Sequence, residues 1–326
     1  MRRLTLFLGL LLLTSDVFAT STPTSSKTVL ISQVALHPAL NITVKGIIDA
    51  LEKKGFKQGE NINIRSESAQ SSFALASQIS VKFLSQTPDV IVGVGTISAQ
   101  SISKYAQEKR CKLIFSSVTD PVEANLIKSL TRPDNNTSGV SNFVPLEPQL
   151  DLFQKLQPSL KRLGVLYNPG ESNSVSILKK LEVLCSDHKI ILVKQTATKT
   201  SDVAQAAVKL AHQVDAIFIS NDSTALSSLQ SIIQAANKVK IPVYVSDTDA
   251  VQLGALAALG PNQYDVGLQT GDMIARVLKG ENVAEMPVEF PKKIDLYLNA
   301  AAAKLVGITL PETLKREAAK LIETSS

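Results

Sequence analysis

Small polar residues follow four apolar segments of this 326-residue chain. The junctions are VIVGVGTISAQS (90–101), LIFSSVTDPVEA (113–124), LGVLYNPGESNS (163–174) and AIFISNDSTAL (216–226). Each indicates a strand that passes directly into the start of a helix. Hydroxyls and free backbone N–H groups at such a place bind carboxylates, and carboxylates there bind ammonium groups. The residue types therefore indicate a binding site for a small polar molecule.

Serine and threonine side chains in the first two junctions are candidates for binding a carboxylate. They are Thr96, Ser98, Ser116, Ser117 and Thr119. The macrodipole of a helix that begins there would add to the attraction. The same residue types are also the favoured N-cap residues of helices, so a capping role is the alternative for each.

Three acidic residues in the second half of the chain are candidates for binding an ammonium group: Glu171, Asp222 and Asp247. Each comes just after a predicted strand. Asp222 and Asp247 are the better placed, because two neighbouring strand ends that both present Asp favour a cation between them. Helix capping is again the alternative. Asp120 precedes a proline and is predicted to cap the next helix.

An aromatic ligand would also need an apolar wall. Phe143 is the first candidate for this wall and Tyr167 the second. Tyr167 follows the apolar residues 163–166, so a position in the core of a sheet is the alternative for it.

Motifs for catalysis, cofactors and metals are missing from the sequence. Residues 93–98 read G-x-G-x-x-S and lack the third glycine of a dinucleotide-binding loop, and no P-loop, HExxH or G-x-S-x-G is present. His37, His188 and His212 are scattered. Aromatic residues make up 5% of the chain, and no stripe of lysine or arginine accompanies the net charge of +5. We therefore expect no enzyme, no cofactor, no metal and no nucleic-acid partner.

The N-terminus has the features of a secretory signal peptide. Arg2 and Arg3 precede an apolar run over residues 4–13, and Val17 and Ala19 occupy the −3 and −1 positions of a cleavage site. The run is too short for a permanent membrane span, although an uncleaved anchor is the alternative. No cysteine follows the run that could carry a lipid. We expect cleavage after Ala19 and a mature protein that is free in the periplasm.

Predicted strands and helices alternate along the chain. Uninterrupted apolar strands such as residues 89–94 are typical of parallel sheets that are buried on both faces. Because the alternation starts again at Lys161, the sequence predicts an α/β fold with two doubly wound parallel-sheet lobes and a cleft between them. The predicted first lobe is residues 28–141 plus about 251–283. The predicted second lobe is residues 142–250 plus about 284–326.

The two cysteines, Cys111 and Cys185, fall in different predicted lobes. The Cα atoms of a disulfide lie within about 7 Å of each other, so we expect two free thiols.

Several motifs together resemble a known family. They are HPAL (37–40), SSVTDPVEA (116–124), LGVLYNPGESNS (163–174), ISNDSTAL (219–226) and NAAAAKLVGITLP (299–311). The chain from about residue 28 to 323 is similar to the substrate-binding proteins of ABC uptake transporters of the tryptophan/aromatic amino-acid type. The resemblance implies the type I periplasmic-binding-protein fold, in which two lobes joined by three crossovers close on a ligand. It also implies delivery of an amino acid, with Trp, Phe or Tyr favoured, to a membrane permease. We expect the protein to be a monomer.

Two positions depart from the family pattern. The family usually has an aspartate after His-Pro-Ala-Leu and another in a strand-end loop before a proline, where this chain has Asn41 and Asn142. Each replacement keeps a hydrogen-bonding side chain but removes a negative charge. The ammonium contact, and with it the exact ligand, therefore stays open.

Two other functions stay open from the sequence. The same fold serves exported sensors that act on a membrane receptor, and it binds other small solutes such as sugars and nucleosides. The chain has no tryptophan and few aromatic residues, which argues against a carbohydrate ligand, because sugars are commonly stacked on aromatic rings.

Overall fold

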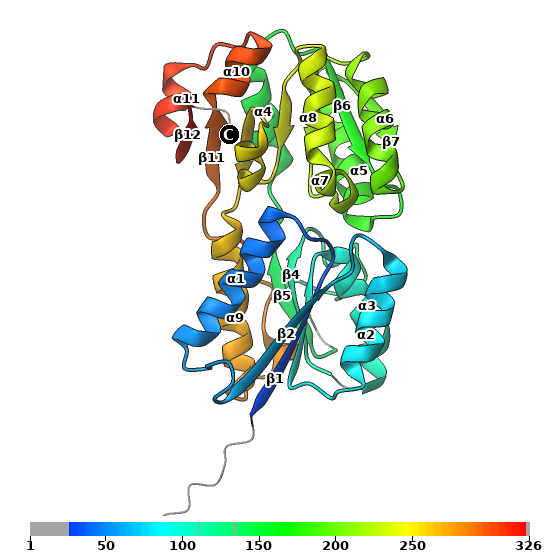
Figure 1. Cartoon of the computed structure of the whole chain (residues 1–326), viewed down its shortest axis with the longest axis vertical. Helices are drawn as coiled ribbons and strands as arrows, with labels where there is room; N and C mark the ends of the chain where they lie inside the picture. Colours follow the sequence, from blue (N-terminus) through cyan, green and yellow to red (C-terminus); the bar gives the residue numbers. More distant parts are fainter. Residues whose placement is uncertain (1–25, 110, 134, 324–326) are drawn as a thin grey trace, which may run out of the picture.

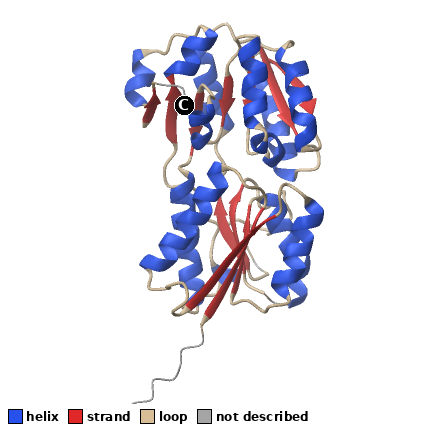
Figure 2. Ribbon diagram, viewed as in Figure 1, coloured by secondary structure: helices blue, strands red, loops and turns tan. Residues whose placement is uncertain are grey.

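The computed structural model describes residues 26–109, 111–133 and 135–323, and this part of the chain forms two lobes (Figure 1). Each lobe is a sheet with helices packed on both faces (Figure 2). The α/β class and the two lobes that the sequence predicts are confirmed. The predicted signal peptide at residues 1–19 lies outside the described residues.

The first lobe is built on five parallel strands. Their order across the sheet is β2 (Ile62–Ser68), β1 (Lys27–Gln33), β3 (Val90–Val94), β4 (Leu113–Val118) and β5 (Thr137–Ser141). One pair of contacting helices, α1 (Pro38–Lys53) and α9 (Gln263–Leu278), covers one face of this sheet, and α2 (Phe73–Leu84) and α3 (Thr96–Lys109) cover the other (Figure 1). Because both faces are covered, every residue of β3 is buried, as its uninterrupted apolar sequence predicts.

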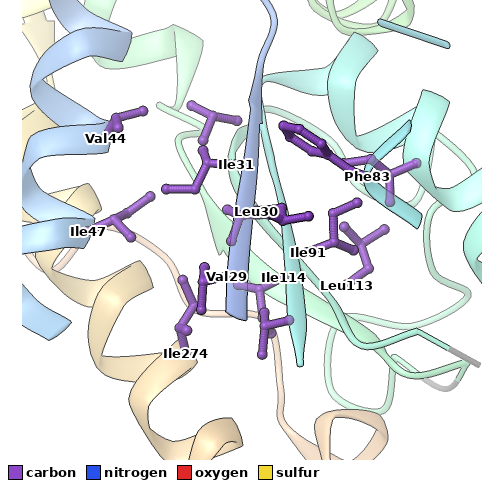
Figure 3. Close-up of a cluster of buried hydrophobic side chains, with 14 of the residues drawn as sticks. Val29, Leu30, Ile31, Val44, Ile47, Phe83, Ile91, Leu113, Ile114 and Ile274 are labelled. Carbon is purple, nitrogen blue, oxygen red and sulfur yellow. The ribbon is translucent and has the colours of Figure 1, made fainter. Parts of the chain in front are cut away.

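The core of the first lobe joins the sheet to these helices. Figure 3 shows Leu30 of β1 and Ile91 of β3 among side chains that include Ile47 of α1, Phe83 of α2 and Ile274 of α9. All five are fully buried. Burying one such side chain contributes about 1.5–3 kcal/mol, so this cluster fixes the strand ends from which the site is built.

The second lobe is built on seven strands. Their order is β12 (Lys320–Ile322), β11 (Asp295–Asn299), β10 (Ala257–Gly260), β9 (Val243–Val245), β8 (Ala216–Ile219), β6 (Arg162–Tyr167) and β7 (Ile191–Thr196). All neighbouring pairs are parallel except β10 and β11. The helices of this lobe are α4 (Leu146–Leu156), α5 (Ser172–Asp187), α6 (Thr200–Ala211), α7 (Ser223–Ser227), α8 (Leu229–Lys238), α10 (Ala300–Val306), α11 (Glu312–Glu317) and the 3₁₀ turn η1 (Thr248–Leu253).

Helix α9 returns the chain to the first lobe, where it lies directly against α1. A Cβ atom on Gly46 of α1 would come within 2.4 Å of the carbonyl oxygen of Tyr264, and one on Gly267 within 2.2 Å of the carbonyl oxygen of Thr43. Only glycine allows two helix backbones to approach this closely. This contact holds the start of α9 beside the cleft.

We propose that the second and third crossovers between the lobes come later than the sequence predicts. Strand β10 pairs with β9 and β11, so the second sheet extends to Gly260, beyond the predicted boundary at residue 250. The 3₁₀ turn η2 (Val283–Glu285) and the residues after it stay with the first lobe, because Ser141 N donates to the carbonyl oxygen of Glu289. We propose crossovers near residues 142, 261 and 291.

Candidate ligand-binding site

A cavity lies where the strand ends of the two lobes face each other. Its lining residues follow β1, β3, β4 and β5 of the first sheet and β6, β8, β9 and β10 of the second: Val34, His37, Ala39, Leu40, Gly95, Thr96, Ser117, Asn142, Asn173, Asn221, Ser223, Leu226, Asp247 and Gln263. The carboxyl ends of parallel strands are where open α/β sheets bind ligands. The cavity is therefore the candidate site.

Three long helices begin at the first-lobe side of the cavity. Helix α3 starts at Thr96, α1 follows His37, and α9 starts at Gln263. Their N-termini carry free N–H groups and the positive ends of the helix dipoles. Gly95 allows the turn into α3, because it has a φ of 87° and a Cβ there would lie 2.4 Å from the side chain of Val34. This side of the cavity attracts negative charge.

Ser117 is placed in the cavity by an irregularity in β4. The register between β4 and β5 shifts between Ser116 and Val118, and Ser117 has a φ of 54°. Such a bulge redirects a side chain, here from the sheet into the cavity. The Ser117 hydroxyl donates to Gln263 Oε1 at 3.4 Å, and the Thr43 hydroxyl donates to the same oxygen at 3.3 Å. The Gln263 oxygen is thus occupied, and its NH₂ group is the part left for a ligand.

Asn142 and Asn221 are joined across the cleft through Thr119. The Asn221 amide nitrogen donates to Thr119 Oγ1 at 3.4 Å, and that hydroxyl donates to Asn142 Oδ1 at 3.3 Å. Asn142 of the first lobe therefore keeps its NH₂ group for a ligand. Asn221 of the second lobe keeps its oxygen.

His37 lines the cavity but brings no charge to it. Its side chain is buried, and burial lowers its pKa to about 4. The imidazole is therefore neutral at pH 7. Among the lining residues that the structure describes, none is lysine or arginine, so the attraction for an anion comes from helix N-termini, hydroxyls and amides.

Asp247 is the acidic residue of the cavity. It lies after β9, and its Oδ1 accepts a hydrogen bond from the backbone N–H of Asp249 at 3.1 Å, which caps η1. Burial, together with the nearby charge of Asp249, raises the Asp247 pKa to about 7. A cation beside this carboxyl would favour its ionised form. Asp247 therefore both caps η1 and lines the cavity.

Glu171 and Asp222 are fully buried behind the second-lobe wall and do not line the cavity. Glu171 accepts hydrogen bonds from the backbone N–H groups of Ser223 at 2.8 Å and Thr224 at 3.0 Å. Asp222 accepts from the N–H groups of Asn168 and Ala225, both at 2.7 Å. Burial raises the pKa of both carboxyls. They position the loops after β6 and β8. Asp222 caps α7, as in the capping alternative, whereas Glu171 makes no side-chain cap hydrogen bond to its own helix α5 and bonds to the start of α7 instead.

Five further residues predicted for the site lie outside the cavity lining. Ser98 and Ser116 are buried within the first lobe, where they bond to Ser32 and Thr270. The Thr119 hydroxyl accepts a hydrogen bond from Asn221 and donates one to Asn142, and so links these two residues. Asn41 is exposed and accepts a hydrogen bond from Gln33. The ring of Phe143 lies 4.9 Å from Lys180 Nζ. Thr96, Ser117, Asn142 and Asp247 are the predicted residues that the structure brings together at the cavity.

Sequence reasoning missed several lining residues. Asn173, Asn221 and Ser223 belong to motifs that the sequence singles out. Their neighbours Glu171 and Asp222 are the stronger candidates by sequence, because a carboxylate complements an ammonium group better than an amide or a hydroxyl does. Gln263 follows a segment whose return to the first lobe the sequence does not reveal. The apolar lining comes from Val34, Ala39, Leu40 and Leu226. Tyr167 packs against the core of the second lobe instead.

Contacts across the cleft hold the lobes close together. Lys180 Nζ of α5 lies 2.9 Å from Asp120 Oδ2 of the first lobe, and the Ser176 hydroxyl donates to the same oxygen at 3.3 Å. On another side, the hydroxyls of Ser71 and Ser227 are 3.2 Å apart. The lobes are therefore in a closed arrangement around the cavity.

The described residues contain no group of three or more side chains suited to hold a metal ion. They also contain no helix with the length and apolar character needed to cross a membrane. Cys111 lies in the first lobe and Cys185 in the second, both as free thiols.

Two α/β lobes that close on a polar cavity define a solute-binding protein of the periplasmic type. Residues 28–322 match the family described as ABC transporter substrate binding protein. The chain belongs to this family of extracytoplasmic binding components of ABC transporters.

Three proteins are similar to this chain over most of its length. A tyrosine-binding protein of Clostridioides difficile is 34% identical over 86% of this chain and 81% of its own. A Streptococcus pneumoniae ABC domain in complex with L-Trp is 30% identical, with 91% and 100% of the chains covered and a TM-score of 0.88. A substrate-binding protein of Clostridium difficile in a ligand-free, open structure is 33% identical with the same coverage, and its TM-score is 0.68. The lower score with the open structure agrees with the closed arrangement of the lobes here.

Proposed function

We propose that this protein binds a free amino acid, with tyrosine or tryptophan as the first candidates, and delivers it to the permease of an ABC transporter. The observation that carries the proposal is the division of the cavity by lobe. The first lobe presents helix N-termini and the NH₂ groups of Asn142 and Gln263, and the second presents Asp247 and the oxygen of Asn221. Such a division complements a molecule with a carboxylate at one end and an ammonium group at the other.

The preference for an aromatic amino acid rests on the relatives. One is named for tyrosine, and another was solved with L-Trp, at 34% and 30% identity. Val34, Leu40 and Leu226 supply an apolar part of the lining against which an apolar side chain of the ligand can pack. We further propose that the mature protein begins after Ala19, is free in the periplasm and acts there as a monomer without enzymatic activity.

The test is a thermal-shift screen of residues 20–326 against the twenty amino acids, sugars and nucleosides, followed by calorimetry. A ligand present at 1,000 times its Kd stabilises the folded state by about 4 kcal/mol, which gives a clear rise in Tm. We expect L-tyrosine or L-tryptophan to raise the Tm. Stabilisation by sugars or nucleosides alone would contradict the amino-acid proposal and leave the family assignment intact.

A further inference from the structure

Asn173 is the lining residue with an unmatched polar atom. Its side chain is 5% exposed, and among the described residues its Oδ1 is one of four buried side-chain atoms that have no hydrogen-bond partner. The other three belong to Gln157, Ser172 and Tyr244, which do not line the cavity. Buried acceptors are nearly always paired in folded proteins, so an unpaired one at a ligand cavity requires an explanation.

The orientation of the Asn173 amide is fixed by its neighbours. Its Nδ2 donates to the carbonyl oxygen of Asn221 at 2.6 Å and lies 3.5 Å from Glu171 Oε2. The Asn221 carbonyl oxygen can only accept, and Glu171 Oε2 already accepts from the N–H group of Ser223 at 2.8 Å. Turning the amide over would place oxygen against oxygen. The atom that remains for a ligand is therefore Oδ1, an obligate acceptor.

The surroundings of Asn173 favour a cationic donor over a neutral one. Asn173, Asn221 and Asp247 follow β6, β8 and β9, which are consecutive strands of the second sheet. Neighbouring strands are about 4.8 Å apart, so side chains from these three strand ends can reach one small group. The carboxyls of Glu171 and Asp222 lie directly behind this wall. Acceptors and acids gather here. Helices α5 and α7 also begin on this side, but the first N–H groups of α7 are already bonded to Glu171 and Asp222.

We propose that Asn173 is a specificity-determining residue whose Oδ1 accepts a hydrogen bond from the ammonium group of the ligand, beside Asp247. This inference rests on the proposed function, because it needs an amino acid in the cavity. The ligand then lies across the cleft with its ammonium group toward the second lobe and its carboxylate toward the first. Glu171 acts as a positioning residue, since it helps to fix the orientation of the Asn173 amide, which binds the ammonium group.

The test compares each amino acid with an analogue that lacks only the amino group. The pairs are L-tryptophan with 3-indolepropionic acid, and L-tyrosine with 3-(4-hydroxyphenyl)propionic acid. Calorimetry is done on residues 20–326 as wild type, Asn173→Ala and Asn63→Ala, where Asn63 is an exposed residue of β2 outside the cavity. Asn173→Ser replaces the alanine variant if that variant does not fold.

We expect Asn173→Ala to weaken binding of the amino acid by about 10- to 100-fold, as for the loss of a hydrogen bond to a charged group. We expect a change of less than about threefold for the analogue, and none in either case for Asn63→Ala. Equal losses for both members of a pair would show a purely structural role and overturn the inference, as would no loss for either. If the wild type binds no amino acid at all, the proposed function is wrong and the inference falls with it.

Discussion

The two halves of the cavity differ in which end of each amide they leave free. In the first lobe, the oxygens of Asn142 and Gln263 are bonded to hydroxyls and their NH₂ groups remain. In the second lobe, the nitrogens of Asn173 and Asn221 are bonded and their oxygens remain. The same amide group thus serves as donor on one side and acceptor on the other. Recognition of the ligand therefore depends on how neighbouring groups orient each amide as well as on residue type.

The charges of the two halves follow the same division. The first-lobe side has the N-termini of α1, α3 and α9 and a neutral His37. The carboxyls of Asp247, Glu171 and Asp222 gather on the second-lobe side, where Glu171 and Asp222 bond the first N–H groups of α7. This division also accounts for Asn142. A donor on the first-lobe side suits a carboxylate, so the loss of the negative charge usual in the family is compatible with this orientation of the ligand.

Asp247→Asn should have the largest effect on binding. Removing one partner of a buried, hydrogen-bonded charge pair costs about 2–5 kcal/mol, so we expect a loss of affinity for the amino acid of about 30- to 4,000-fold. Calorimetry of the variant measures it, with Asp265→Asn, an exposed acid in the first turn of α9, as control. An affinity within threefold of the wild type would remove Asp247 from the site.

Glu171→Ala should act first on the stability of the second lobe. It leaves the N–H groups of Ser223 and Thr224 and the O–H of Thr224 without the acceptor they have in the wild type, which is costly for buried donors. We expect the free energy of unfolding to fall by about 1–3 kcal/mol. Urea denaturation checks this against Glu147→Gln, a change at an exposed acid of α4. Equal midpoints for both variants would show that Glu171 does not support this wall.

The affinity for the amino acid should depend on pH through Asp247. Its pKa is raised to about 7 by burial, so in the free protein the carboxyl takes up a proton as the pH falls below 7. An ammonium group binds the ionised form, and affinity should fall by up to about tenfold per pH unit between pH 7 and 5.5. The affinity for the amino acid should therefore be weaker at lower pH. Titrations at several pH values should show a much flatter profile for Asp247→Asn, and an unchanged slope would refute the assignment.

Thr96→Ala and Ser117→Ala should weaken binding through the other end of the ligand. Thr96→Ala removes a hydroxyl at the N-terminus of α3, and Ser117→Ala removes the hydroxyl that orients the Gln263 amide at the N-terminus of α9. A single hydrogen bond contributes about 0.5–1.5 kcal/mol, so we expect a 3- to 10-fold loss for each. The loss should be absent for tryptamine, which lacks the carboxylate, in a side-by-side titration. A loss for tryptamine of the same size would mean that these hydroxyls do not read the carboxylate.

Lys180→Met should have the smallest effect. Lys180 Nζ lies 2.9 Å from Asp120 Oδ2 across the cleft, but its side chain is 45% exposed. Exposed ion pairs contribute about 0.2–1 kcal/mol, so closure and affinity should weaken by no more than about fivefold, and less in high salt. Calorimetry at two salt concentrations checks this, with Lys179→Met as the neighbouring control. A loss above tenfold would mean that the ion pair matters more than its exposure indicates.

Much of the fold could be predicted because its signals are local. Apolar strands such as β3 and the strand-helix alternation define parallel sheets directly. The return of the chain through α9 could not be predicted from these signals, because it depends on a close contact between Gly46 and Gly267, more than 200 residues apart. The placement of β10 in the second sheet is likewise set by pairing with β9 and β11.

The site was predictable as a set of loops but not residue by residue. An N-cap and an anion-binding group use the same side chains in the same geometry, so the sequence could not separate Thr96, which faces the cavity, from Ser98, which faces the interior. The roles of Glu171 and Asp222 depend on which N–H groups the fold brings to them. The free oxygen of Asn173 depends on the carbonyl of Asn221, which no local pattern reveals.

The most direct test of the account is a crystal structure of residues 20–326 with L-tryptophan or L-tyrosine. We predict an amino acid in the cavity, with its ammonium group within hydrogen-bond distance of Asp247 and Asn173 Oδ1. Its carboxylate should lie at the N-terminus of α3, near Thr96 and Ser117. A ligand bound in the opposite orientation, or outside this cavity, would contradict the division of the site between the two lobes.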